Sequence, residues 1–131
     1  MRRWVQGFEV IDSRFTDYSF ALPDVVADNA SSAYFVVGGK GVSPEELDLA
    51  LEAVVLTVNG ATVATATGAA VQGHPAEALA LAANSLAERG MFIDAGEVVL
   101  TGGLTDAVPV SAGDQISAEF TNLGSLFVTG A

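Results

Sequence analysis

Carboxylate side chains gather near the start of the 131-residue chain, where Glu9, Asp12, Asp24 and Asp28 follow one another closely. Carboxylate oxygens are hard ligands that suit Mg²⁺, an ion that keeps bound water and open positions for a substrate. A solvent-exposed acidic face is the alternative interpretation, in which Asp12 pairs with Arg14 or caps a turn. The spacing alone favours this alternative and leaves a metal site as a hypothesis.

Two further segments carry small polar groups that suit a small ligand. The run Asp28-Asn29-Ala30-Ser31-Ser32 lies between apolar segments and offers carboxylate, amide and hydroxyl groups. The run Thr101-Gly102-Gly103-Leu104-Thr105 offers backbone amides and hydroxyls that can hold a carboxylate. The alternatives are that the first run caps its own backbone and that the second is an ordinary glycine turn.

Other kinds of catalytic site find little support in the sequence. The chain has no cysteine, which excludes disulfides, thiol nucleophiles and thiolate metal sites. A serine triad would have to use His74, whose place directly before Pro75 favours helix capping instead. The glycine-rich stretch 38–43 lacks the spacing of a phosphate-binding loop, so it predicts a surface turn.

The composition predicts one soluble domain over residues 1–131 and excludes several partners. Half of the residues are apolar, which is enough for a buried core. Five basic against 16 acidic residues give a formal charge of −11, which disfavours nucleic acid and anionic membranes. Glu9 and Asp12 interrupt any signal-peptide core, and residues 53–76 are too polar to span a membrane. The acidic, cysteine-free balance suits a reducing cytoplasm, so we expect a cytoplasmic protein.

The first half of the chain is predicted to contain strands, a short helix and one clear hairpin. The strands are residues 5–11 and 33–37, the short helix covers about 23–30, and a helical turn or two follows Ser43. Asn59-Gly60 tolerates the positive φ angles of a tight turn, which predicts a hairpin between residues 49–58 and 61–66.

The second half is predicted to contain the main helix and further strands. Pro75 suits a first helical turn and Gly90 a left-handed stop, which gives a helix over about residues 75–89. Its predicted buried stripe is Leu79, Ala82, Ala83 and Leu86. The predicted strands are residues 98–101, 115–121 and 125–129, with an edge segment at 108–110. The expected class is α+β, a β-rich mixed-sheet roll or sandwich with one main helix.

Several of these segments, in this order, resemble the fumarylacetoacetate hydrolase superfamily. The similar branch is that of the 2-hydroxypenta-2,4-dienoate hydratases and 4-oxalocrotonate decarboxylases of aromatic and steroid ring breakdown. The runs that carry the resemblance are Gly7-Phe8-Glu9-Val10-Ile11-Asp12-Ser13-Arg14, Leu22-Pro23-Asp24-Val25-Val26-Ala27-Asp28-Asn29-Ala30-Ser31-Ser32, Gly73-His74-Pro75, Val99-Leu100-Thr101-Gly102-Gly103-Leu104-Thr105 and Val108-Pro109-Val110. The resemblance extends from Gly7 to about Val128.

The resemblance implies a β-rich fold with a Mg²⁺ or Mn²⁺ site that chelates a 2-oxo acid. In the hydratases, a dienol is ketonised and water then adds to give a 4-hydroxy-2-oxo acid. Carried over to this chain, Glu9 is similar to a metal-binding carboxylate of that site. The other roles carried over are catalytic for Asp28, Asn29 and Ser31, and substrate-binding for Ser32, Thr101, Gly102 and Thr105.

The chain also departs from the pattern of the family. Members are about twice as long, and their Glu-x-Glu metal ligands lie upstream of the segment that corresponds to Glu9. No Glu-x-Glu occurs in this chain, and the usual serine after Thr101-Gly102 is Gly103. We therefore expect the second half of a hydro-lyase, inactive without its upstream half.

Two alternatives remain open beside the incomplete hydro-lyase. One is a metal-independent β-roll that binds, isomerises or cyclises an apolar molecule through Phe8, Phe20, Tyr34 and Phe35. The other is a non-catalytic partner subunit. Under each interpretation we expect a homo-oligomer or a completing partner chain, because removing half of a two-part fold exposes surface.

Overall fold

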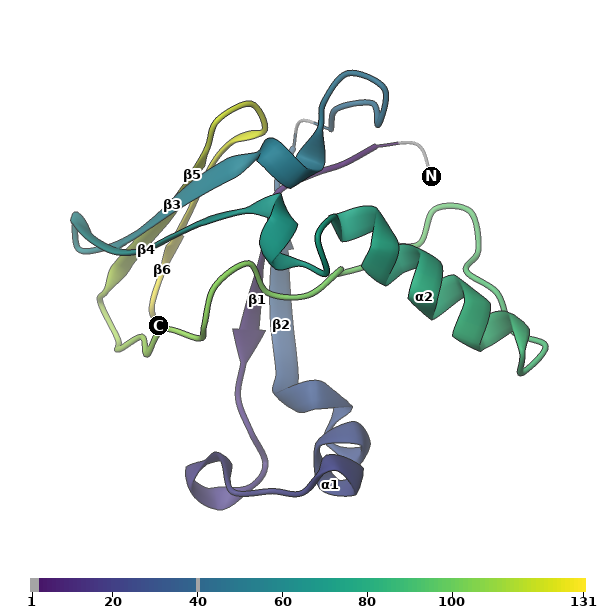
Figure 1. Cartoon of the computed structure of the whole chain (residues 1–131). Helices are drawn as coiled ribbons and strands as arrows, with labels where there is room; N and C mark the ends of the chain where they lie inside the picture. The colour runs from purple at the N-terminus through teal and green to yellow at the C-terminus, as the bar shows by residue number, and fades with distance from the viewer. Residues whose placement is uncertain (1–2, 40) are drawn as a thin grey trace.

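A computed structural model describes residues 3–39 and 41–131 and confirms the α+β class (Figure 1). The strands in these residues are β1 (Gly7–Ile11), β2 (Ser32–Val37), β3 (Ala53–Val58), β4 (Ala61–Thr67), β5 (Gln115–Phe120) and β6 (Gly124–Thr129). The α-helices there are α1 (Leu22–Ala27) and α2 (Pro75–Ala87), and short 3₁₀ turns cover Thr16–Tyr18, Asn29–Ser31, Leu49–Leu51 and Gly68–Ala70. Lys40, in the predicted glycine-rich turn, lies outside the described residues.

The larger sheet is antiparallel, with the strand order β4-β3-β5-β6. β3 and β4 form the predicted hairpin, and φ angles of 51° at Asn59 and 81° at Gly60 allow its two-residue turn. β5 and β6 form a second hairpin. The two hairpins are joined where β3 pairs with β5, with Val54 opposite Phe120 and Val58 opposite Ile116.

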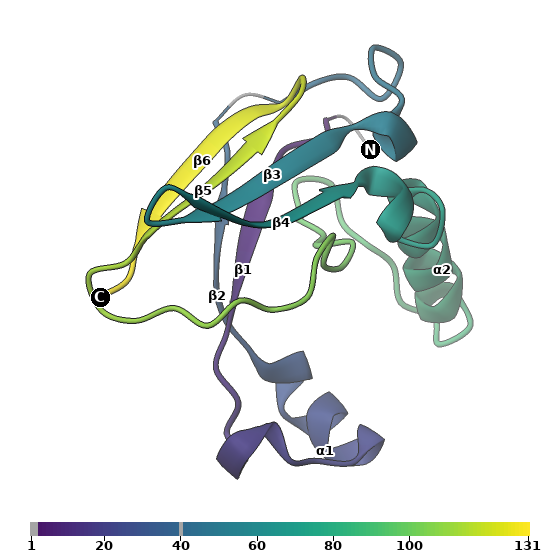
Figure 2. The same ribbon diagram turned by 60° about the vertical axis from the view of Figure 1, so that its left-hand side comes forward.

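β1 and β2 form a separate antiparallel ribbon, with Gly7 opposite Val37. Residues 12–31, between these strands, fold into a small unit that contains α1. Figures 1 and 2 both show this unit at the far end of the ribbon, away from the larger sheet and from α2. We call residues 7–37 the arm and residues 12–31 its tip.

The main core lies where the larger sheet meets the first turn of α2. Trp4, Leu49 and Leu123 are buried together there. Partly buried side chains that pack on this cluster are Val42, Leu47, Ala76 and Phe120. One face of the larger sheet adds the buried residues Val54, Ile116, Ala118 and Leu126. No large side chain among the described residues is completely buried, so the core is thin for a chain that is half apolar.

The main helix begins as predicted and ends two residues early. His74 caps it, because its Nδ1 accepts a hydrogen bond from the Ala76 backbone N–H over 3.0 Å. The predicted buried stripe is wrong. Leu79, Ala82 and Leu86 are only partly buried and Ala83 is exposed, because α2 extends away from the larger sheet beyond its first turn (Figure 1).

Three further predictions are corrected by the structure. Residues 98–101 and 108–110 are not strands in the described structure, because they pair with no neighbouring strand and Pro109 has no N–H to donate. The helical turn expected after Ser43 is a turn closed by the Glu46 N–H and the Ser43 carbonyl. No helix among the described residues is long and apolar enough to cross a membrane.

Candidate functional site

Asp28 is the centre of a polar cluster that closes the tip of the arm. Its side chain is only 2% exposed and forms an ion pair with Arg14, whose Nε donates to Oδ1. Ser31 Oγ donates to Oδ2 over 3.1 Å, and Ser13 Oγ lies 3.4 Å from the same oxygen. Arg14 also donates through Nη2 to the Asp28 carbonyl. These bonds tie the first residues of the tip to its last residues.

The pKa of Asp28 lies below its ordinary value as the result of opposing effects. Desolvation by burial raises the pKa. The hydrogen bonds from Arg14 and Ser31 and the positive charge of Arg14 together lower the pKa by more than burial raises it. Asp28 is therefore ionised at neutral pH. Because a carboxylate with a lowered pKa is a weak base, the geometry favours a positioning role for Asp28. The catalytic role given to it above stays a prediction.

The segment that follows Asp28 has an unusual backbone. Asn29, Ala30 and Ser31 have φ angles of 53°, 54° and 61°, so the predicted helix over residues 23–30 ends at Ala27. Left-handed backbone costs about 1–2 kcal/mol per non-glycine residue. Backbone strain of this kind is concentrated at functional sites.

Hydrogen bonds from both sides hold this left-handed turn. The Asp12 N–H donates to the Ser31 carbonyl over 2.8 Å, and the Ser31 N–H donates to the Asp28 carbonyl over 3.0 Å. Ser31 is buried, whereas the Asn29 side chain is exposed and Ser32 is partly buried at the start of β2. Asn29 and Ser32 are therefore the polar side chains of this run that a ligand can reach.

Glu9, the predicted metal ligand, is exposed on β1 opposite Phe35. Within residues 3–39 and 41–131, no three His, Cys, Asp or Glu side chains lie close enough together to hold a metal ion. The Asp28 carboxylate already forms an ion pair with Arg14, and the Asp24 carboxylate accepts a hydrogen bond from the Ala21 N–H over 2.9 Å. Because Mg²⁺ needs several placed ligands, the described residues alone do not fit a complete magnesium site.

The second predicted ligand segment lies beside β4. An open cavity of about 660 Å³ is lined by residues 63–65, Ala70 and residues 103–108. Thr105 lines this cavity, but its Oγ1 already donates to the Asp106 carbonyl over 3.0 Å. Gly102, just before the cavity, has a φ angle of 108° that only glycine adopts readily, so the segment is a glycine turn as well as a candidate ligand site.

The structure brings some of the predicted residues together and separates others. A Cβ atom on Gly7 would lie 4.0 Å from Leu100 Cδ2, so the side chain of Leu100, next to Thr101, approaches the start of β1, the strand of Glu9. The Asp28 cluster lies at the other end of the ribbon (Figure 1). Among the described residues, no hydrogen bond links this cluster to residues 101–105.

Sequence reasoning missed two structural roles. The sequence suggests Asp12 as a partner of Arg14, whereas in the structure Arg14 forms an ion pair with Asp28. Glu52 is buried and accepts hydrogen bonds from the Asn122 N–H, Asn122 Nδ2 and the Leu123 N–H at 2.7, 2.8 and 2.9 Å. This carboxylate fastens the β5–β6 turn to the start of β3. No local pattern signals it, because its partners lie about 70 residues away.

The fold and these segments define the class of protein. The family model described as "Fumarylacetoacetate (FAA) hydrolase C-terminal" matches residues 10–129. The chain therefore belongs to the fumarylacetoacetate hydrolase family, in the part represented by this C-terminal domain.

Particular relatives extend this assignment. A 4-oxalocrotonate decarboxylase of Pseudomonas sp. (strain CF600) is 50% identical over 118 residues, which are 90% of this chain and 45% of the relative. A 2-hydroxyhexa-2,4-dienoate hydratase of Comamonas testosteroni is 44% identical over 123 residues, 93% of this chain and 47% of the relative. The chain spans about half the length of the curated relatives it matches.

Solved structures share the same backbone. The 4-oxalocrotonate decarboxylase from Pseudomonas putida G7, complexed with magnesium and adipate, superposes with a TM-score of 0.93 at 47% sequence identity. The match covers 97% of this chain and 48% of that chain. The same enzyme complexed with calcium and acetate gives a TM-score of 0.88.

Proposed function

We propose that this chain is the C-terminal, substrate-facing half of a hydratase-like hydro-lyase that acts on a 2-hydroxy-dienoate or 2-oxo acid. The observation that carries the proposal is the match of nearly the whole chain to half of a decarboxylase solved with magnesium and a dicarboxylic acid. The hydratase at 44% identity supports the hydro-lyase reaction. We place the reaction in aromatic or steroid ring catabolism and the protein in the cytoplasm.

The proposed roles follow from where the side chains lie. Glu9 supplies one exposed carboxylate to a Mg²⁺ or Mn²⁺ site, and the other ligands come from a second polypeptide segment. A divalent ion at such a site acts as a Lewis acid toward a 2-oxo acid. The side chain of Leu100, the residue before Thr101, approaches β1 at Gly7, two residues before Glu9, and we propose that a bound acid contacts both segments.

The polar residues of the chain bind and orient the acid. Thr101 offers its hydroxyl, and Gly102 and Thr105 offer their backbone amides, to its carboxylate. Asn29 and Ser32 present reachable polar groups from the strained turn, while Asp28 and Ser31 fix that turn by their mutual hydrogen bond.

The alternative of an apolar ligand pocket receives no support from the cavity. Its predicted lining included Phe20, Tyr34 and Phe35, and none of them lines the 660 Å³ cavity. All three side chains are exposed. We therefore retain the hydro-lyase as the proposed function. We also retain the proposal that the chain forms a homo-oligomer or associates with a completing partner chain.

The test is the loss of ultraviolet absorbance of 2-hydroxypenta-2,4-dienoate, with Mg²⁺ and with chelator. It is run on the purified chain alone and on the chain mixed with the unmatched, upstream half of the Pseudomonas sp. (strain CF600) decarboxylase. We expect no chelator-sensitive turnover by the chain alone and measurable turnover by the mixture. Glu9→Gln should lower the turnover of the mixture by on the order of 100-fold.

Glu119→Gln is the matched control, because Glu119 is another exposed strand carboxylate of the chain. Its turnover in the mixture should equal that of the unchanged chain. Chelator-sensitive turnover by the chain alone would overturn the incomplete site. A folded mixture that is equally active with Glu9→Gln would overturn the role of Glu9.

A further inference from the structure

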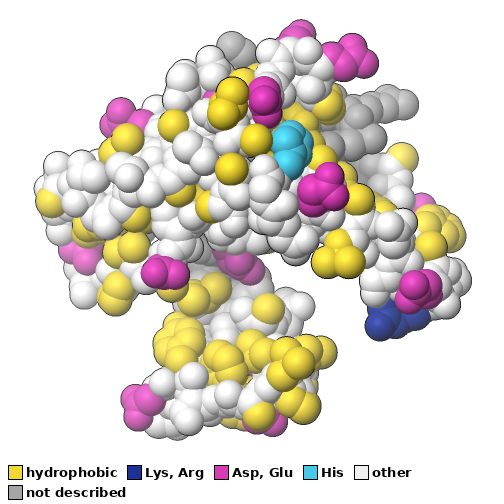
Figure 3. Space-filling model, viewed as in Figure 1, with side chains coloured by type: hydrophobic (Ala, Val, Ile, Leu, Met, Phe, Trp, Pro, Cys, Tyr) yellow, Lys and Arg dark blue, Asp and Glu magenta, His cyan; other side chains and the backbone are white. Residues whose placement is uncertain are grey.

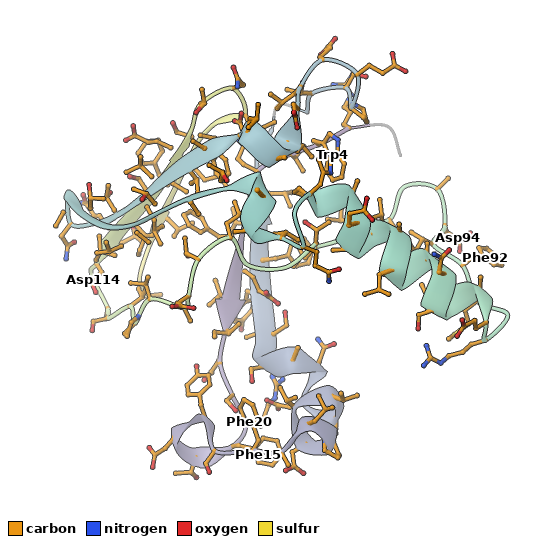
Figure 4. The ribbon with its side chains drawn as sticks, in the orientation of Figure 1. Trp4, Phe15, Phe20, Phe92, Asp94 and Asp114 are labelled. Atoms are coloured by element: carbon orange, nitrogen blue, oxygen red, sulfur yellow. The ribbon has the colours of Figure 1, made fainter. Side chains whose placement is uncertain are left out.

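The turn between β3 and β4 is fastened to the start of β5 by the side chain of Asn59. Asn59 Nδ2 donates to Asp114 Oδ1 over 2.7 Å, and Asn59 Oδ1 accepts from the Gln115 N–H over 2.9 Å. The Asn59 backbone N–H also donates to the Gln115 carbonyl over 2.8 Å. Figure 4 shows Asp114 beside this turn, at the end of the larger sheet that is far from α2. We call these contacts of Asn59 with Asp114 and Gln115 the turn joint.

The turn joint pairs an amide that donates with a carboxylate that accepts. Hydrogen bonds from Asn59 Nδ2 and from the Ser111 N–H hold the pKa of Asp114 below its ordinary value, although desolvation by burial raises it. Among the described residues, no cation pairs with Asp114, and Figure 3 shows no Lys or Arg at this end of the sheet, at the left of that view. Glu119, further along β5, lines the same surface hollow as Gly60 and adds to the negative charge. A new negative charge at the joint would therefore repel Asp114 directly.

Asn59 is also the one asparagine of the sequence that a glycine follows. Gly60 carries no Cβ that would shield its backbone nitrogen, and both residues are exposed to water. That nitrogen can attack Asn59 Cγ, so that the N–Cγ bond forms, the Cγ–Nδ2 bond breaks, and Nδ2 leaves as ammonia with the proton of the Gly60 N–H. Water then opens the succinimide ring and leaves aspartate or isoaspartate at position 59.

The turn joint restrains this reaction in the folded chain. Ring closure requires the Asn59 amide to leave Asp114 and the Gln115 N–H and to turn toward the Gly60 nitrogen. Loss of one such hydrogen bond favours the open state by roughly fivefold. Deamidation at Asn59 therefore proceeds through the open joint, and its rate follows how often the joint opens.

We propose that Asn59 is a site of spontaneous deamidation that Asp114 restrains, and that the new carboxylate unfastens the β3–β4 turn from β5. The amide nitrogen that donates over 2.7 Å is replaced by an oxygen that cannot donate when the carboxyl group is ionised. Two carboxylate oxygens then lie at hydrogen-bond distance, where like charges disfavour the ionisation of both groups. The inference is independent of the proposed function, because it uses no ligand, substrate or metal contact.

The first experiment incubates the full chain in mildly alkaline buffer and measures deamidation by mass spectrometry of its peptides. Asn59 should convert ahead of the asparagines that a residue with a side chain follows, which are Asn29, Asn84 and Asn122. Asp114→Ala should raise the rate at Asn59 by roughly fivefold, as expected for one lost hydrogen bond. Asp48→Ala is the matched control, because Asp48 also accepts a backbone N–H within its own turn but takes no part in the turn joint. It should leave the rate at Asn59 unchanged.

The second experiment compares the thermal unfolding of Asn59→Asp and Asn59→Gly. Both variants lose the amide that donates to Asp114, glycine tolerates the φ angle of 51°, and only the first variant adds a charge. At neutral pH, Asn59→Asp should melt about 4 °C below Asn59→Gly. Repulsion raises the folded-state pKa of the carboxylate pair above the unfolded value of about 3.9, so stability is lost as the pH rises through the raised pKa. The gap between the two melting temperatures should therefore close as the pH falls below about 4.

Each contrary outcome would overturn part of the proposal, provided that circular dichroism of the variants matches that of the unchanged chain. An Asn59 that stays intact while another asparagine converts is not the site of deamidation. Equal rates in Asp114→Ala and Asp48→Ala would show that Asp114 does not restrain the reaction. A gap between Asn59→Asp and Asn59→Gly that is absent at neutral pH, or as large in acid, would show that the new charge does not unfasten the turn.

Discussion

Asp28 shows how a single buried carboxylate organises the residues around it. Its two oxygens accept from Arg14 and Ser31, and these bonds hold three consecutive left-handed residues in place. Without that anchor, the turn would relax, since each left-handed residue costs free energy. The polar run 28–32 therefore stabilises its own left-handed turn and is also the candidate ligand segment. The sequence left both interpretations open.

Replacing Asp28 by Asn should lower stability in a pH-dependent way. The folded-state pKa of Asp28 is lowered, so its ion pair stabilises the fold above the unfolded pKa of about 3.9 and is lost as the pH falls through the folded pKa. We expect thermal unfolding to show a melting-temperature deficit for Asp28→Asn that is constant from about pH 7 to 5 and shrinks below about pH 4.

The control for this prediction is Asp17→Asn, which removes one negative charge from an exposed position of the same tip. Its deficit at neutral pH should be the smaller of the two. A deficit for Asp28→Asn that is as large in acid as at neutral pH would show that the charge of Asp28 contributes nothing.

Among the elements, local chemistry predicted those that are stabilised locally. The Asn59-Gly60 hairpin and the start of α2 at His74-Pro75 were predicted correctly, because turn and cap preferences lie in adjacent residues. The strand expected at residues 98–101 was wrong, because a short apolar run needs a partner edge that the sequence does not specify.

The same distinction applies to the candidate site. The contact between Asp28 and Ser31 joins residues three apart, so a short motif could indicate it. The Arg14–Asp28 pair and the Glu52–Asn122 bond depend on how distant segments meet, which no local pattern reveals.

Gly60→Ala should destabilise the β3–β4 hairpin. Gly60 has a φ angle of 81° and open space around its Cα, so an added methyl group meets backbone strain rather than a steric clash. We expect the free energy of unfolding in urea to fall by about 1 kcal/mol.

Gly39→Ala is the matched control for the hairpin variant, because Gly39 also has open space around it but its φ angle does not lie in the left-handed region. Its free energy of unfolding should change by no more than about 0.5 kcal/mol. Equal losses in the two variants would refute the explanation by backbone strain at Gly60.

At the scale of the whole molecule, the chain is a fold with much of its apolar surface uncovered. Its core is thin, α2 extends beyond the sheet and the arm projects (Figure 1). Family members with which it aligns are about twice as long. These features are consistent with the proposal of a homo-oligomer or a completing partner chain.

The isolated chain should bind Mg²⁺ only weakly. The described residues bring no three potential metal ligands together, so calorimetric titration should give a dissociation constant above about 1 mM. Glu9→Gln should titrate like the unchanged chain under the same conditions. Micromolar binding that Glu9→Gln abolishes would instead show a magnesium site within this chain.

The pairing of β3 with β5 has a consequence for the order and rate of folding. Each hairpin of the larger sheet closes within a short stretch and can form in about 1–10 µs. When the two hairpins pair, Val58 lies opposite Ile116, and the residues between these two positions, including α2, form a long closed loop. We expect this late closure to be the slow step, yet doubling the looped length adds only about 0.6 kcal/mol. Insertions in residues 90–97, between α2 and the candidate ligand segment, should therefore be well tolerated, and this part of the connection is where chain length is free to vary.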